Sequence, residues 1–227
     1  MPIIARAGRV VLRDYGGSGP PVVFVPSLIN PPLILDMPYR RSLLRWLSRQ
    51  GVRALMVDWG APSPQHRDQD VAQHIEDMLI PLLRSIGEPT ALVGYCLGGT
   101  MAMAAAAAVS ARGLALIAAP WRFSGFGAEA IARIESLWDG AHETCDRLGL
   151  VPMEVLQSGF WQLDPARTIA KYERFGRLDP ASAAAKSFVA MEDWANAGPP
   201  LTYAAGRQVF DDLFTADLPG RKRWRVA

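Results

Sequence analysis

The sequence predicts an α/β fold in which a mostly parallel sheet has helices on both faces and carries a helical cap. Short apolar strands alternate with helical segments over the first 120 residues, helices alone follow, and one strand passes directly into a helix through a glycine-rich turn. The expected organisation is a core over residues 1–120, a cap over residues 121–215, and a basic tail over residues 216–227 that also fits the beginning of the next core strand.

The composition is that of a folded domain rather than of a disordered chain. Half of the 227 residues are hydrophobic, 20% are charged, and the formal net charge is +2. Four basic residues lie in the last seven positions (Arg221, Lys222, Arg223 and Arg225), and removing them changes the net charge from +2 to −2. The body of the chain therefore has no basic surplus, which argues against nucleic acid as a partner.

Cysteine usage and hydropathy predict a cytoplasmic protein. The two cysteines, Cys96 and Cys145, are too few for a disulfide framework, and no cysteine–histidine cluster has the spacing of a metal site. The first 14 residues lack the apolar run of a signal peptide, and the longest run of small apolar residues, 101–109, is too short to span a bilayer. We therefore expect no transmembrane segment and no metal.

Each element of the predicted core is indicated by a local sequence pattern. Short apolar runs rich in β-branched residues are typical of buried strands, and they cover residues 9–14, 21–25, 53–57, 90–95 and 113–118. Helical spacing of apolar or small residues predicts helices over residues 39–50, 70–86 and 99–109. The second helix begins with a capping box at Asp70 and Gln73. Pro81 should distort that helix, because an interior proline costs about 3 kcal/mol.

The predicted cap is rich in aromatic side chains. Residues 121–215 show helical patterns and no convincing buried strand, and they hold 13 of the 20 aromatic residues of the chain. One interpretation is a second helical layer that packs on the sheet. The other, which the abrupt change of pattern favours, is a cap whose aromatic side chains line an apolar pocket over an active site.

The most specific motif has Cys96 at the centre of a G-x-C-x-G sequence between a predicted strand and a predicted helix. This is the pattern of a nucleophile elbow with cysteine in place of serine. Gly94 and Gly98 lack the side chains that would clash across the turn. The positive end of the helix dipole is expected to lower the pKa of Cys96, and the backbone N–H of Leu97 is placed to stabilise an oxyanion.

The alternative is that Cys96 is an inert, buried cysteine in a tight turn. The context favours a nucleophile, because a strand precedes the turn, a helix follows it, and the loop after Val25 lies where a second oxyanion donor is required. That donor is assigned to the backbone N–H of Ile29. Cys145 lies in a polar helical segment and is interpreted as incidental.

Several motifs, in order, resemble the poly(hydroxyalkanoate) synthases, a branch of the α/β-hydrolases. The similar segments are residues 26–30, 34–36, 57–60, 94–99, 191–194 and 198–201. The resemblance implies an α/β-hydrolase fold and a cysteine, Cys96, that carries a growing polyester as a thioester and takes 3-hydroxyacyl groups from acyl-CoA. It implies no bound cofactor, and a place in the cytoplasm at the surface of polyester granules.

Thioester chemistry supports a transferase over a hydrolase. A thioester on Cys96 and one on coenzyme A are close in energy, so acyl exchange between them is nearly balanced, and a substrate hydroxyl can then attack. A serine would hold the acyl group as a lower-energy ester. An aromatic cap suits an acyl chain and the exclusion of water.

The resemblance does not extend to the catalytic acid and base of the family. In this fold the chain order is nucleophile, acid and histidine, and the last two follow late strands. We expect those strands to be missing, which implies a truncated synthase of weak or no activity. His66 is considered as a substitute base, because its loop lies on the same face as Cys96. His74 is expected on a helix surface, His142 in the cap, and Asp58 in a turn beside the nucleophile.

Three functions stay open on these residues. The chain is a truncated synthase, a related cysteine hydrolase or thioesterase, or a non-catalytic acyl-binding module at the granule that partners a complete synthase. Its partners are then acyl-CoA and a hydroxyalkanoate chain, with a second copy or a synthase as the protein partner. The strand over 113–118 is expected at an edge of the sheet, where it self-associates, limits solubility, or is covered by the tail near Trp224.

Overall fold

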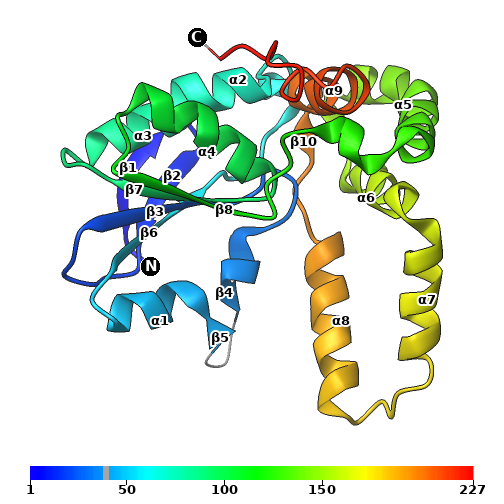
Figure 1. Cartoon of the computed structure of the whole chain (residues 1–227), viewed down its shortest axis with the longest axis horizontal. Helices are drawn as coiled ribbons and strands as arrows, with labels where there is room; N and C mark the ends of the chain where they lie inside the picture. The colour runs from blue at the N-terminus through cyan, green and yellow to red at the C-terminus, as the bar shows by residue number, and fades with distance from the viewer. Residues whose placement is uncertain (38–40, 227) are drawn as a thin grey trace.

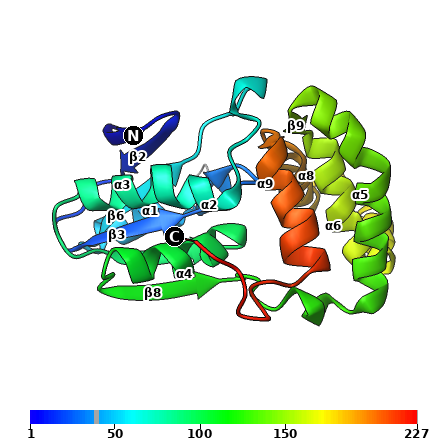
Figure 2. The ribbon, with the colours of Figure 1, turned by 90° about the horizontal axis from the view of Figure 1, so that it is seen from above.

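The computed structural model describes residues 1–37 and 41–226. It contains a six-stranded sheet with helices on both faces and a helical region beside the carboxyl ends of the parallel strands (Figures 1 and 2). The strands are β1 (Ile3–Ala7), β2 (Val10–Asp14), β3 (Pro21–Val25), β6 (Arg53–Asp58), β7 (Ala91–Tyr95) and β8 (Gly113–Ile117). Their spatial order is β1-β2-β6-β3-β7-β8.

The sheet is mostly parallel, as predicted. Strands β6, β3, β7 and β8 run parallel to one another, whereas β2 pairs antiparallel with β6 and β1 pairs antiparallel with β2. Strand β1 is not among the predicted strands, and its exposed residues explain why, since they carry no buried apolar run. The other five strands lie within one or two residues of the predicted ranges.

The two faces of the sheet bury alternate residues of the central strands. In β3, Val23 and Val25 join a large cluster on one face, together with Met101 of the helix that follows β7. Phe24 points to the other face, where it joins a smaller cluster with Leu44. This alternation places both faces of β3 in apolar surroundings, which is why its sequence is continuously hydrophobic.

The core helices are placed close to the predicted ranges. They are α1 (Leu43–Arg49), α2 (Val71–Gln73), the π-helical turn η3 (His74–Leu79), α3 (Ile80–Ser85) and α4 (Leu97–Ala108), with short connecting elements η1 (Pro32–Leu35), β4 (Asp36–Met37), β5 (Arg41–Ser42) and η2 (Pro64–His66). Helix α1 lies on one face of the sheet, and α2, α3 and α4 lie on the other (Figure 1). Positions 39 and 40 of the first predicted helix lie outside the described residues.

The predicted helix over residues 70–86 is distorted near Pro81. It begins with the predicted capping box, in which Asp70 accepts from the Gln73 N–H and Gln73 accepts from the Asp70 N–H. A π-helical turn follows, in which the N–H of Ile80 donates to the carbonyl of Ile75, five residues earlier. The wider turn precedes the proline, whose missing N–H and bulky ring disfavour regular helical bonding.

Helices dominate the chain after β8, as expected. They are η4 (Phe123–Phe126), α5 (Ala128–Leu148), α6 (Met153–Leu163), α7 (Pro165–Phe175), α8 (Ala183–Asn196), α9 (Tyr203–Arg207) and the π-helical η5 (Gln208–Thr215). The expectation of no buried strand here is wrong, because β9 (Leu150–Val151) pairs antiparallel with β10 (Leu201–Thr202). Each has two residues, which is too short to show a strand period.

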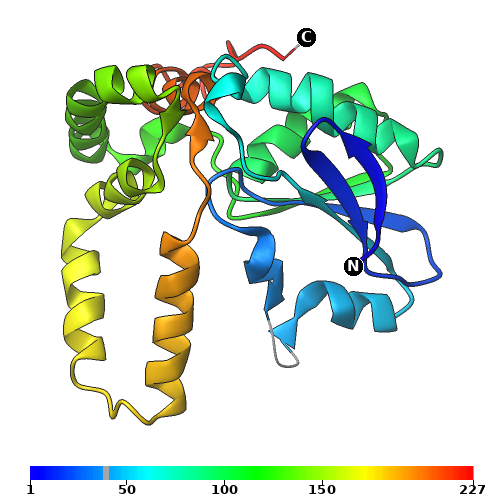
Figure 3. The same cartoon turned by 180° about the vertical axis from the view of Figure 1, so that it is seen from behind.

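The helical region shares its hydrophobic core with the sheet. Ile134 and Trp138 of α5 and Phe210 of η5 belong to the same buried cluster as the apolar residues of β3 and β7. Helices α7 and α8 extend away from this cluster as an antiparallel pair (Figures 1 and 3). Within the described ranges, 1–37 and 41–226, no helix is both long and apolar enough to cross a bilayer.

Strand β8 forms an edge of the sheet, as predicted, and all five of its residues are exposed. The tail after η5 does not form the strand considered for it, since residues 216–226 contain only turns and irregular backbone. Trp224 instead packs edge-to-face against Trp121, with ring centroids 6.3 Å apart. With Val226 it lines a cavity bordered by Ile80 and Ala104, so this part of the tail lies against α3 and α4.

Candidate active site

Cys96 occupies the turn between β7 and α4, where the sequence motif placed it. Its backbone has φ 53° and ψ −131°, a conformation that non-glycine residues rarely adopt. The turn is held from both sides, because the Cys96 N–H donates to the carbonyl of Ile117 (2.9 Å) and the Gly99 N–H donates to the carbonyl of Cys96 (2.8 Å). Strained backbone held by its surroundings is common at catalytic nucleophiles.

The glycines of the motif allow three close contacts around the turn. A Cβ atom on Gly94 would overlap the backbone of Gly99, and one on Gly98 would overlap the carbonyl of Pro26. A Cβ on Gly99 would overlap the side chain of Ala119. The predicted steric role of Gly94 and Gly98 is thereby confirmed, and the first turn of α4 packs directly on the loop after β3.

The expectation that the helix N-terminus lowers the pKa of Cys96 is wrong in its net direction. Burial raises the pKa of the Cys96 thiol, and this effect outweighs two hydrogen bonds that lower it, from the Leu97 N–H and from the Ser27 side chain. The donors at the start of α4 are therefore present, but the loss of water around the sulfur is larger. Cys145 is 1% exposed in α5, and burial likewise raises its pKa.

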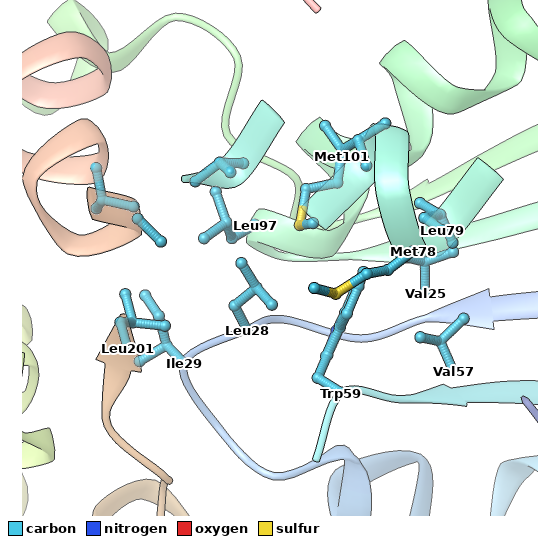
Figure 4. Close-up of a cluster of buried hydrophobic side chains, with 14 of the residues drawn as sticks. Val25, Leu28, Ile29, Val57, Trp59, Met78, Leu79, Leu97, Met101 and Leu201 are labelled. Carbon is cyan, nitrogen blue, oxygen red and sulfur yellow. The ribbon is translucent and has the colours of Figure 1, made fainter. Parts of the chain in front are cut away.

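The two residues assigned as oxyanion donors are both engaged in this structure. The N–H of Leu97 acts on the Cys96 thiol, whose pKa it lowers. The N–H of Ile29 donates to Ser27 Oγ, with a distance of 3.1 Å. Leu28 and Ile29 curve past Leu97 in the loop after β3 (Figure 4). Both oxyanion assignments stay predictions, since each N–H would have to turn toward a substrate oxygen.

The three histidines have other partners in the structure. His66 Nδ1 lies 3.0 Å from both the N–H and the Oγ of Ser63, so it closes the short turn η2. His142 lies in α5, and its ring centroid is 6.1 Å from that of Trp138. The role of His66 as a substitute base therefore stays a prediction.

His74 is not on a helix surface, contrary to expectation. It is 2% exposed, its Nδ1 lies 2.6 Å from the Asp70 carbonyl, and its ring packs edge-on against Trp59. Its Nε2 faces the guanidinium of Arg9 at 2.5 Å. Burial lowers the pKa of His74 to about 4. The spacing of position 74 from the buried residues Val71 and Met78 is the signal that would have placed it on the inner face.

Asp58 has a structural role in the turn after β6. It pairs with the Arg13 guanidinium at 2.8 Å and accepts from the Gly60 N–H at 3.1 Å. The adjacent Trp59 donates its indole N–H to the carbonyl of Pro26 (3.0 Å) and is buried beside Met78 (Figure 4). Trp59 thus supports the loop after β3, a role that sequence reasoning missed.

A small apolar cavity lies between the helical region and the loop after β3. It has a volume of about 30 Å³, and its lining includes Ile29 from the loop, Phe160 and Gly159 from α6, and Phe210 and Phe214 from η5. A cavity with so little polar surface favours apolar groups over water. Among residues 1–37 and 41–226, no group of three histidine, cysteine, aspartate or glutamate side chains could hold a metal ion.

Comparison with known sequences gives a consistent result. A model described as "Alpha/beta hydrolase family" matches residues 22–226. The chain is 31% identical over 202 residues to "Poly(3-hydroxyalkanoate) polymerase subunit PhaC" of Haloferax mediterranei, covering 86% of this chain and 41% of that protein. The protein of the same name from Haloarcula marismortui is 28% identical, with 92% and 46% covered. The chain thus spans about half the length of these curated relatives.

Comparison with solved structures supports the fold. A thermophilic esterase from Thermogutta terrifontis, with malate bound, superposes with a TM-score of 0.51 and 18% identity, covering 92% of this chain and 70% of that one. At this identity the likeness concerns the fold, which is the predicted α/β-hydrolase arrangement. The predicted resemblance to the poly(hydroxyalkanoate) synthases is confirmed by the polymerase relatives.

Proposed function

The chain belongs to the α/β-hydrolase family, and we propose that it acts there as an acyltransferase of the polyester synthase type, with Cys96 as its nucleophile. The observation that carries the proposal is the position of Cys96 at a strained turn between β7 and α4, in a chain similar to poly(3-hydroxyalkanoate) polymerase subunits. A thiol suits transfer between thioesters, because the bond formed and the bond broken are nearly equal in energy.

The first half-reaction forms an acyl-enzyme. The Cys96 thiolate attacks the thioester carbonyl of a 3-hydroxyacyl-CoA, the bond from that carbon to the sulfur of coenzyme A breaks, and coenzyme A leaves as a thiolate. In the tetrahedral intermediate, the N–H of Leu97 and the N–H of Ile29 are the proposed donors to the oxyanion. The Ile29 N–H must leave Ser27 Oγ for this purpose.

The second half-reaction transfers the acyl group to a hydroxyl. The hydroxyl oxygen of another 3-hydroxyacyl unit attacks the carbonyl carbon on Cys96, its proton passes to solvent water, and the carbon–sulfur bond breaks to release the Cys96 thiolate. In the described part of the chain His66 and His74 have hydrogen-bond partners of their own, and we expect this step to be slow without a base beside Cys96. General-base assistance is worth about 10²–10⁴-fold, and turnover is expected to be reduced to that extent.

The helical region supplies the apolar environment that this chemistry needs. The cavity bordered by Ile29, Phe160 and Phe214 lies next to the loop that contacts Cys96, and its lining suits the aliphatic part of a hydroxyacyl group. Excluding water from this region favours transfer to a hydroxyl over hydrolysis.

Acyl labelling tests the proposal. The protein is incubated with 3-hydroxybutyryl-CoA, and the adduct is located by peptide mass spectrometry. We expect a stoichiometric acyl group on Cys96, none in Cys96→Ala, and an unchanged adduct in the control Cys145→Ala. Release of free 3-hydroxybutyrate at the rate of acylation would instead show a thioesterase, and absence of any adduct would show a non-catalytic module.

A further inference from the structure

A second cavity lies between the tail and α4, apart from the site at Cys96 (Figure 2). Its volume is about 410 Å³, which lies within the range of small-molecule sites. Every described residue that lines it is apolar: Ile80 of α3, three alanines of α4, Trp121 after β8, and Trp224 and Val226 of the tail. The alanines lie about two helical turns or more along α4 from Cys96, so this cavity is not part of the proposed acyl-transfer site.

The shape of the cavity suits an alkyl chain. Ala107 and Ala108 are exposed in it, because their methyl groups are too short to fill the space beneath the tail. The rings of Trp121 and Trp224 pack edge-to-face, with centroids 6.3 Å apart, and provide a broad apolar wall. The indole N–H of Trp224 is buried and has no hydrogen-bond partner among residues 1–37 and 41–226. The Trp224 side chain is thus held by apolar contacts alone, and a bound alkyl chain would add to them.

Cationic side chains adjoin this cavity on two segments of the chain. Arg122 directly follows Trp121, and Arg223 and Arg225 flank Trp224. All three arginines are exposed, and the ion pairs found among the described residues include none of them. A guanidinium group binds carboxylate and phosphate groups through paired hydrogen bonds. An apolar cavity with free cations beside it therefore has the chemistry to hold a molecule that is apolar at one end and anionic at the other.

We propose that this cavity binds a single-chain amphipathic anion, with its alkyl chain between α4 and the two tryptophan rings and its head group at Arg223 and Arg225. The head group is a carboxylate or a phosphate, since arginine binds both. The lining favours an alkyl chain over a nucleic-acid base, because its side chains offer no hydrogen-bond acceptor to a base edge. The inference does not depend on the proposed role of Cys96.

Calorimetric titration of the protein with octanoate, octyl phosphate and octanol tests the inference, since the three probes share one alkyl chain. Both anions should bind, and octanol should bind about threefold to tenfold more weakly, because exposed ion pairs contribute modestly. Ala107→Phe fills the cavity and should weaken all three probes about tenfold or more, since two methylene groups left unburied are enough for that factor. The control Ala190→Phe makes the same change on the exposed side of α8 and should bind all three normally.

A pair of arginine substitutions tests the head group separately. Arg223→Gln combined with Arg225→Gln should weaken both anions about threefold to tenfold and leave octanol unchanged. Arg167→Gln combined with Arg174→Gln removes the same net charge from α7, where both side chains are exposed, and should leave the binding of every probe within about twofold. Octanoate and octyl phosphate differ only in the anion, so their relative affinity shows whether a carboxylate or a phosphate is the preferred head group.

The other results of these titrations overturn the inference. Octanol binding as tightly as the anions excludes a role for the arginines, and unchanged binding in Ala107→Phe excludes the cavity. Single-stranded DNA that binds more tightly than octyl phosphate, and is lost in the Arg223 and Arg225 variant, would assign the site to nucleic acid. A dimer in sedimentation that Ala107→Phe dissociates would assign the cavity to a second copy of the chain. If Ala107→Phe does not fold, the arginine pair decides, because both side chains are exposed.

Discussion

Strands β3 and β8 have the same length, similar apolar sequences and the same direction in the sheet, yet β3 is almost entirely buried and β8 is exposed throughout. The difference comes from their neighbours. Strand β3 pairs on both sides, with β6 and β7, and each of its faces joins a hydrophobic cluster. Strand β8 pairs with β7 alone. Both apolar segments therefore form strands. Only the strand that has neighbours on both sides is buried and contributes strongly to the stability of the fold.

Truncating one side chain in each strand is the strongest test of this comparison. Phe24→Ala in β3 should lower the free energy of unfolding by about 3–5 kcal/mol, because it leaves a cavity between the sheet and α1. Leu116→Ala in β8 should change it by less than about 1 kcal/mol, since Leu116 is 45% exposed. Urea unfolding measures both, and equal losses would show that β8 is covered in solution.

Acidification is expected to lower the free energy of unfolding, because His74 is buried in its neutral form. Its pKa is lowered from 6.5 to about 4 in the folded protein, so the unfolded chain binds the extra proton first as the pH falls. Stability is therefore full above pH 6.5 and decreases as the pH approaches 4, by up to about 3 kcal/mol. Unfolding of His74→Gln should lack this dependence between pH 6.5 and 4, and a slope equal to that of the unsubstituted protein would contradict the assignment.

Two glycine substitutions compare the effect of an added Cβ atom in the tight turn with its effect on the open surface. Gly98→Ala places a Cβ against the carbonyl of Pro26 and should cost about 1–3 kcal/mol, together with slower alkylation of Cys96. Gly140→Ala in α5 meets open space and should stabilise the protein by up to about 1 kcal/mol. Thermal unfolding of both proteins tests the contrast. If Gly98→Ala leaves the stability unchanged, the loop after β3 moves to make room for the added Cβ atom.

The smallest expected effect is at the free edge of β8. Its outer N–H groups should exchange with deuterium well before those of β3, and the protein should associate as its concentration rises. Leu116→Lys should reduce this association while leaving the monomer folded. Sedimentation and hydrogen exchange measure both, and a protein that stays monomeric with strongly protected outer N–H groups in β8 would break the comparison.

Local features of the site were predictable from the sequence because they depend on near neighbours in the chain. The turn at Cys96 follows from a strand, two glycines and a helix within a few residues, and the distortion near Pro81 follows from the proline itself. The pKa of Cys96 was not predictable in the same way. It depends on how far the folded chain removes the sulfur from water and on the side chain of Ser27, which lies about 70 residues earlier in the sequence.

Other features were missed for different physical reasons. The inner position of His74 was encoded in helical spacing from Val71, but a polar residue in a first turn favours a surface assignment. Strands β9 and β10 are set by their antiparallel contact across about 50 residues, which no local pattern reports. The hydrogen bonds of His66 with Ser63 depend on the backbone conformation of the turn η2, which the composition of the loop does not report.

The hydrogen bond from the Cys96 N–H to the Ile117 carbonyl couples the turn at Cys96 to the edge of the sheet. Gly99 packs on Ala119, and Thr100 donates its hydroxyl proton to the Pro120 carbonyl, so the segment after β8 holds the same turn from outside. An edge strand opens more readily than the centre of a sheet. An opening of β8 would break the bond to the Ile117 carbonyl, so the fraction of molecules with the turn at Cys96 intact is expected to follow a local equilibrium. Low denaturant concentrations should therefore slow the proposed acylation of Cys96 by acyl-CoA while the fold as a whole persists.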